Sequence, residues 1–314
     1  RPKRSGIRSA PKHNTAMSEN DLYILLCGFL VAINGSLLGT YLTLQKNALL
    51  SDAISHAVLP GILVAFMLSQ SKASFPLLLG AVASGLFLTQ AIFWLQEKAK
   101  MQKDAALGIT YTFMFALGLI LLNLYLGNID LDAECVLFGE IAYVPVDLIQ
   151  LPWIGLIPRA LTLLVPSAAV CIAVVYLSKR PLFLSTFNPE FSQSIGLNVK
   201  RWQGILLTLT CLYTVMAFEL IGAIMVVGFI IIPPVTAQLF SFNLKQMLVL
   251  SHVFGCLAVL IGYFVGYYLN ISLTGTMVCT SGIILFLCLL VKNRRRKDLG
   301  NGRAEVFFQH QHKK

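Results

Sequence analysis

The sequence predicts an all-α polytopic integral membrane protein, and three observations support this prediction. Of the 314 residues, 57% are hydrophobic and only 12% are charged, whereas soluble proteins have roughly 45–50% and about 25%. The mean hydropathy is +0.76. The apolar residues also come in runs of about 20, which is the length that crosses ~30 Å of hydrocarbon.

These apolar runs predict eight or nine transmembrane helices. We place the spans at residues 22–44, 48–69, 75–95, 105–126, 160–178, 203–218, 220–240, 246–269 and 273–291. They divide the sequence into a basic N-terminal extension (1–21), a transmembrane domain (22–291) and a basic C-terminal tail (292–314). No GxxxxGK[ST] loop for nucleotide phosphates occurs, so we expect any ATP hydrolysis to take place in a separate partner.

The charges of the connecting loops predict the orientation, because short cytoplasmic loops collect Lys and Arg. The segments 96–104, 178–202 and 292–297 are basic, whereas the connection 127–159 holds five carboxylates and one arginine. We therefore expect the basic loops and the tail to be cytoplasmic and the acidic connection to lie outside. The net charge of +10 then points to contact with anionic lipid and not with nucleic acid.

This orientation leaves the basic N-terminus outside, against the same rule. Either a tenth crossing or a re-entrant segment lies within 133–159, or residues 1–16 are an added or processed extension. We favour the second explanation, because Met17 begins the stretch MSENDLYILL, which reads as an original start.

Ionisable residues within the spans are informative, because each is costly unless it faces protein or water. Asp52 and His56 stand four residues apart, so both project from one face of a helix. Either they act as a polar contact between helices, or they bind a transition metal such as Mn, Fe or Zn, which accept carboxylate and imidazole ligands. Two ligands are too few for such an ion, but a symmetric second subunit would double them.

Four segments carry a resemblance to a known family. They are LLSDAISHAVLPGILVAF (49–66), KDAALGITYTFMFALGLILL (103–122), AECVLFGEI (133–141) and IGAIMVVGFIIIPPVTAQLF (221–240). In this order the chain resembles the membrane permease subunits of ABC transporters for manganese, zinc and iron, over most of residues 22–291. The first segment is similar to the second-span signature of that family and is the most specific of the four.

The resemblance implies a type II ABC importer-like permease in the bacterial cytoplasmic (inner) membrane. Such a permease pairs with a second permease subunit, two cytoplasmic ATP-binding subunits and an extracytoplasmic metal-binding protein, and it holds no permanent cofactor. Asp52 and His56 match the family's metal path. The chain departs from many relatives at 45–47, where QKN replaces a pair of arginines, and at Pro233 and Pro234, where a single proline is doubled.

Residues 188–196 predict a short helix in a basic cytoplasmic loop. Asn188 is a cap residue, Pro189 suits the first helical position, Glu190 lies in the first turn, and Gly196 ends the helix. The resemblance implies that this is the coupling helix that contacts the ATP-binding subunit, with Glu190 and Gln193 as exposed contacts. The alternative is an ordinary interfacial helix that lies on the lipid headgroups.

Three further residues are candidates for a gate. Pro60 and Gly61 follow His56 by one turn, and a helix can bend there because proline removes a backbone donor. Glu219 lies where two spans meet on the outer side; a solvated helix end is the favoured interpretation, and a role at the outer gate is the alternative. His252, also within a span, has no acid nearby in the sequence and is expected to be a packing histidine.

The predicted function is therefore a metal permease that works by alternating access with energy from a partner's ATP. A permease for chelated metal (haem, siderophore or cobalamin) is the first alternative, and a proton-coupled carrier that uses Asp52 or Glu219 is the second. One Asp and one His do not separate manganese from zinc or iron. Whether the second permease is another copy or a related chain is also open.

Overall fold

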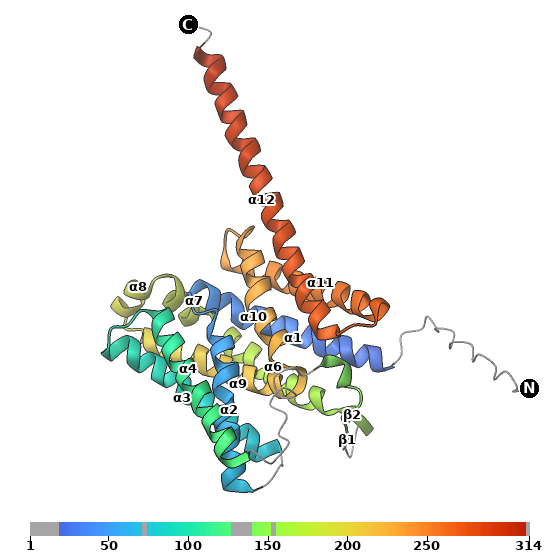
Figure 1. Ribbon diagram of the computed structural model, residues 1–314. Coiled ribbons are helices and arrows are strands. Elements are labelled where there is room, and N and C mark those ends of the chain that lie inside the picture. Colours follow the sequence, from blue (N-terminus) through green and yellow to red (C-terminus); the bar gives the residue numbers. More distant parts are fainter. Residues whose placement is uncertain (1–18, 71–73, 127–139, 152–154, 312–314) are drawn as a thin grey trace, which may run out of the picture.

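The computed structural model describes residues 19–70, 74–126, 140–151 and 155–311, and it is almost entirely helical (Figure 1). The long helices are α1 (Glu19–Leu44), α2 (Leu50–Ser69), α3 (Ser74–Lys98), α4 (Lys103–Leu126), α6 (Arg159–Leu177), α9 (Val199–Ile221), α10 (Ala223–Gln238), α11 (Leu244–Leu269) and α12 (Leu273–Gln311). The short elements are the 3-10 turn η1 (Ile141–Tyr143), the antiparallel strands β1 (Leu148–Leu151) and β2 (Gly155–Pro158), and the helices α7 (Lys179–Phe187) and α8 (Pro189–Ser194).

Each predicted span coincides with one of the long helices. Among the described residues, seven of these helices (α1, α2, α3, α4, α6, α11 and α12) are long and apolar enough to cross a membrane. The remaining two predicted spans are α9 and α10, which are separated at Gly222, where φ is 93°. A non-glycine residue rarely adopts this φ, so Gly222 sets the boundary between the two helices.

Two regions differ from the predicted pattern. Helix α12 continues to Gln311 instead of ending near 291, and it leaves the bundle as a single helix (Figure 1). Hydropathy marks the apolar part of a helix and not its end, so the pattern missed this extension. In the connection 133–159, the described residues 140–151 and 155–158 form a 3-10 turn and a hairpin and contain no helix that could span; 133–139 and 152–154 lie outside the described residues, as do residues 1–16.

Helix α10 occupies the centre of the bundle, where it packs against α1, α9, α11 and α12. Its 16 residues span about 24 Å at 1.5 Å per residue, less than the ~30 Å of a hydrocarbon core. A helix that is apolar on all sides suits this position, because most of its residues are buried in the bundle and Ile224, which is 46% exposed, is apolar as well.

The doubled proline of α10 is explained by the packing of this helix against α1. Pro234 has no N–H, so the carbonyl of Ile230 lacks its usual helical donor. That carbonyl faces Gly39 of α1, where an added Cβ would lie 1.9 Å from the carbonyl oxygen. The absence of a side chain lets the two backbones approach closely, as small residues do between membrane helices. The same relation holds one residue earlier, among Pro233, Phe229 and Gly35.

One end of the bundle is closed by the acidic connection. The carboxylate of Glu140 accepts hydrogen bonds from the backbone N–H of Thr274 (2.9 Å) and from the hydroxyl of Ser272, at the start of α12. In return, the hydroxyl of Thr274 accepts the backbone N–H of Ile141 at 3.0 Å. A carboxylate at a helix N-terminus is favourable because it meets free N–H groups and the positive end of the helix dipole. Glu140 therefore ties the connection to the turn between α11 and α12.

Candidate functional site

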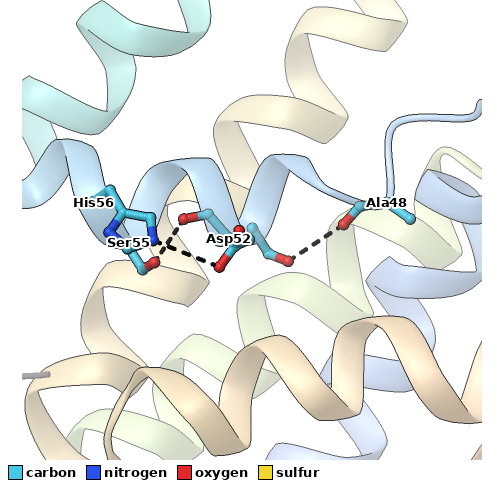
Figure 2. A network of polar contacts seen from close by, with 5 residues as sticks. Ala48, Asp52, Ser55 and His56 are labelled. Carbon is cyan, nitrogen blue, oxygen red and sulfur yellow. Dashed lines mark hydrogen bonds and ion pairs between the residues drawn. The ribbon is translucent and has the colours of Figure 1, made fainter. Parts of the chain in front are cut away.

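Asp52 and His56 lie on the one side of α2 that neighbouring helices leave open. Asp52 is in the first turn and His56 one turn later, with their side chains facing each other (Figure 2). The side chains are 49% and 35% exposed, whereas Ala53, Ile54 and Ala57 on the same two turns are buried against the bundle. The predicted shared face is thus present, and it opens outward from this chain.

The separation of the two groups suits a shared ion better than a direct hydrogen bond. Asp52 Oδ1 and His56 Nε2 are 3.9 Å apart, beyond the range in which a hydrogen bond contributes much. Two ligands at roughly 2.1 Å from a tetrahedral ion stand roughly 3.4 Å apart. A small side-chain rotation therefore brings both atoms to ligand distance.

Aromatic rings of α4 orient the imidazole of His56. The ring centroid of Phe115 lies 5.2 Å away in a T-shaped arrangement, and that of Tyr111 lies 5.8 Å away at a 30° tilt. The Nδ1 atom of His56 is buried and has no hydrogen-bond partner among the described residues. Metal-binding histidines usually donate from the second nitrogen to a partner, so here the aromatic rings hold the imidazole instead.

The serines beside the pair are used by the helix itself. The hydroxyl of Ser55 donates to the backbone carbonyl of Asp52 at 2.6 Å (Figure 2), and that of Ser51 donates to the carbonyl of Ala48 at 3.4 Å. Both serines are buried. Neither hydroxyl points to the open side as a third ligand.

Pro60 and Gly61 have different surroundings. Pro60 lies inside the continuous helix α2, and because it has no N–H, the carbonyl of His56 four residues earlier lacks its helical donor. Gly61 is in close contact with α3: an added Cβ would lie 2.2 Å from the carbonyl oxygen of Gly80. Gly61 therefore has a packing role between α2 and α3, and its role in a gate stays a prediction.

One chain supplies too few ligands for a complete metal site. Among the described residues, no group of three or more His, Cys, Asp or Glu side chains lies close enough together to hold a metal ion. Asp52 and His56 are thus two candidate ligands on an open face, and a tetrahedral site needs four. Glu219 lies in α9 near its end at Ile221, but its side chain is outside the described part of the structure.

The predicted short helix is α8, and its local chemistry agrees with the prediction. The side chain of Asn188 accepts the backbone N–H of Phe191 at 3.0 Å, and Pro189 occupies the first position. The helix ends at Ser194, and Gly196 follows with a φ of 81°, the left-handed conformation in which glycine commonly ends helices. Glu190 and Gln193 are exposed.

Sequence reasoning missed helix α7, which precedes α8 and packs against α8, α9 and the end of α1. It runs from Lys179 to Phe187 and has little net hydrophobicity, so the sequence contains no apolar run that would predict it. The segment α7–α8 lies at the end of the bundle opposite the β1–β2 hairpin (Figure 1). The basic connections 96–104 and 178–202 meet here, because Lys200 Nζ lies 2.6 Å from Glu97 Oε1.

The sequence also did not single out Gln45 as a contact between helices. It is 7% exposed and lies in the linker between α1 and α2. Its side-chain amide donates to the hydroxyl of Thr186 in α7 at 3.0 Å, and its backbone carbonyl accepts from Lys103 Nζ, at the start of α4, at 3.1 Å. Gln45, the first residue of the QKN departure, therefore joins the beginning of the Asp52–His56 helix to the α7–α8 segment.

Comparison with known proteins identifies the family. The chain matches the ABC 3 transport family over residues 19–293. The manganese transport system membrane protein MntD of Bacillus subtilis is 35% identical over 263 residues, which cover 84% of this chain and 89% of the relative. The zinc transport system membrane protein TroD of Treponema pallidum is 33% identical over 267 residues, which cover 85% and 72%.

A solved structure supports the same conclusion. PsaBC from Streptococcus pneumoniae, in complex with Fab, matches with a TM-score of 0.70 and 27% sequence identity, covering 86% of this chain and 91% of that chain. The chain belongs to the ABC 3 transport family and is a multi-pass membrane protein. Both the predicted fold class and the family resemblance are confirmed.

Proposed function

We propose that this chain is the permease subunit of an ATP-driven importer of divalent transition metal ions, with manganese, zinc and iron as the candidate cargo. The observation that carries the proposal is the Asp52–His56 pair on the open face of α2, in a chain that belongs to a transport family with manganese and zinc permeases among its relatives. The two residues divide the work. Asp52 supplies negative charge where an unpaired divalent ion would cost several kcal/mol, and His56 favours transition metals over Mg and Ca, which prefer oxygen ligands.

A second permease subunit completes the site in this proposal. The half-exposed faces of two α2 helices would supply two Asp and two His around a shared axis. A carboxylate and an imidazole on an otherwise apolar span are costly when they face lipid, which supports coverage of this face by protein or by a water-filled path. A second copy and a related chain both fit this arrangement.

The cytoplasmic side of the mechanism runs through α8. Asn188, Pro189 and Gly196 set the bounds of this helix, and Glu190 and Gln193 form the exposed surface that we assign to the ATP-binding subunit.

Movement of α8 can be transmitted to α2 through one hydrogen bond. Gln45, in the linker that precedes α2, donates to Thr186, which lies near the end of α7 and shortly before α8. Alternating access would then follow from ATP-dependent displacement of the two α7–α8 segments. An extracytoplasmic metal-binding protein would deliver the ion at the opposite end.

The experiment is uptake of radioactive manganese and zinc into liposomes that contain the assembled complex, with the loaded binding protein outside and ATP inside. We expect His56→Ala and Asp52→Asn to lower uptake by more than the ~10–100-fold that changes next to metal ligands cost. Ser55→Ala is the matched control, because this buried neighbour bonds only to the helix backbone; its uptake should stay near that of the wild type.

Three results would contradict the proposal. Full uptake by an assembled His56→Ala complex would remove the pair from the metal path. Uptake that continues without ATP but follows an imposed proton gradient would favour the proton-coupled carrier. Uptake of a metal chelate in preference to the free ions would favour the chelate permease.

A further inference from the structure

A large cavity lies far from the Asp52–His56 pair, between α1, α6, α7 and α11. It has a volume of about 690 Å³, and apolar side chains such as Leu37, Ile172 and Leu248 form most of its wall. Among its lining residues, Ile33 and His252 lie farthest from the ends of their helices. They lie eleven residues from the end of α1 and eight from the start of α11, so the cavity reaches about 12–17 Å along the helices at 1.5 Å per residue.

The lysine and arginine side chains of this cavity are gathered at one end. Lys179 and Arg180 begin α7, and Lys245 lies in the first turn of α11. Among the described residues, none of the three has a carboxylate within ion-pair distance. Lys179 instead lies over the ring of Tyr176, with Nζ 4.6 Å from the centroid. Three cations that form no ion pair within the described part of the chain thus surround the mouth of an apolar cavity.

The location of the mouth matches the membrane–water boundary. Helices α6 and α11 both qualify as membrane spans, and α6 ends at Leu177, two residues before the first of the cations. The apolar wall therefore lies at the depth of the acyl chains, and the cations lie at the depth of the headgroups. Basic pockets between membrane helices recognise anionic headgroups in this way.

We propose that this cavity is a binding site for one anionic phospholipid of the membrane. Its phosphate is held by Lys179, Arg180 and Lys245, and an acyl chain lies along the wall that contains Leu37 and Ile172. The charge complementarity favours a lipid over an apolar segment of protein, which would leave the three cations unpaired. The site shares no residue with the metal path, so it stands independently of the proposed transport cycle.

The test is native mass spectrometry of the purified assembled complex, titrated with phosphatidylglycerol, phosphatidylcholine or inorganic phosphate. Phosphatidylglycerol should be retained, whereas phosphatidylcholine and inorganic phosphate should bind far less. Each cation near the surface contributes about a fivefold factor toward anionic lipid, so the triple variant Lys179→Gln, Arg180→Gln, Lys245→Gln should weaken retention about a hundredfold.

Two further variants distinguish lipid binding in this cavity from nonspecific attraction of anionic lipid to a basic protein. The control Lys98→Gln, Lys292→Gln, Arg294→Gln removes the same charges from exposed positions outside the cavity and should keep the lipid. Ile172→Trp fills the cavity without changing the charge and should displace it. Equal losses in the two triple variants, or equal retention of phosphatidylcholine, would overturn the proposal. The proposal would also be overturned if the variant Lys179→Gln, Arg180→Gln, Lys245→Gln kept its lipid but changed the number of permease subunits in the complex. That result would mean that a second copy of the chain covers the cavity.

Discussion

Helices α2 and α10 are both apolar and both contain proline, yet the bundle uses them differently. In α10 the proline-freed carbonyl of Ile230 is pressed against Gly39 of α1, and the helix also packs against α9, α11 and α12. In α2 the proline-freed carbonyl belongs to His56, whose side chain stands on a half-open face. A proline within the helix is therefore part of close packing in α10, whereas in α2 it lies next to the candidate metal ligands.

This difference shows that proline in a membrane helix must be interpreted together with the atom that it frees. A freed carbonyl needs a neighbour or water. Where a glycine on the next helix faces it, as in α10, the carbonyl becomes part of a tight interface. In α2 the freed carbonyl belongs to His56, one of the two ionisable residues, so it lies at the candidate metal site.

The largest effect is expected at the α1–α10 interface. Gly39→Ala would place a methyl group 1.9 Å from the Ile230 oxygen, and because both groups belong to packed helices the permease should lose about 3 kcal/mol or more of stability. Thermal unfolding in detergent measures this loss. Gly108→Ala in α4 is the control, since nothing lies within 4 Å of its added Cβ. Equal stability of the two variants would show that the interface tolerates separation.

An intermediate effect is expected from the prolines themselves. Pro60→Ala supplies an N–H to the carbonyl of His56 and should stabilise α2 by up to about 3 kcal/mol, while it slows metal transport. Pro234→Ala also restores a helical donor, but its transport per folded complex should match the wild type, because α10 has no candidate ligand. Parallel unfolding and uptake measurements compare the two. If Pro60→Ala left transport unchanged, the gate assigned to this turn would be wrong.

The smallest effect is expected where α2 begins. Gln45→Ala and Thr186→Val each remove one side of a single partly buried hydrogen bond, so a double-mutant cycle should give a coupling energy of about 1 kcal/mol. If this bond transmits movement from α7 to α2, both variants should also hydrolyse more ATP per metal ion transported. Additive stability changes together with unchanged ATP use would mean that the contact is incidental.

Much of the fold followed from composition and periodicity alone. The spans were predictable because crossing a membrane requires long apolar helices, and the predicted ends of the long helices from α2 to α11 lie within about four residues of the observed ends. The short helix α8 was predictable because Asn188, Pro189 and Gly196 act through local backbone chemistry. Helix α7 was not, since it has neither an apolar run nor a capping signal of that kind.

The candidate site divides in the same way. The spacing of Asp52 and His56 places them on one face without knowledge of any neighbour. The positions of Tyr111 and Phe115 around the imidazole, and the bond from Gln45 to Thr186, join residues from different helices. No local pattern contains that information. For the same reason, the sequence predicted only that the acidic connection lies outside, whereas the structure shows that Glu140 accepts a hydrogen bond at the start of α12.

The sequence by itself determined that this protein is a multi-span helical membrane protein with a carboxylate and an imidazole on one helical face, because both properties depend on helix geometry and on the cost of polar groups in lipid. Only the tertiary structure decided that this face is open and that α10 is the buried centre. It also decided that three cations surround one apolar cavity. These features depend on which helices meet, and packing between distant segments settles that choice.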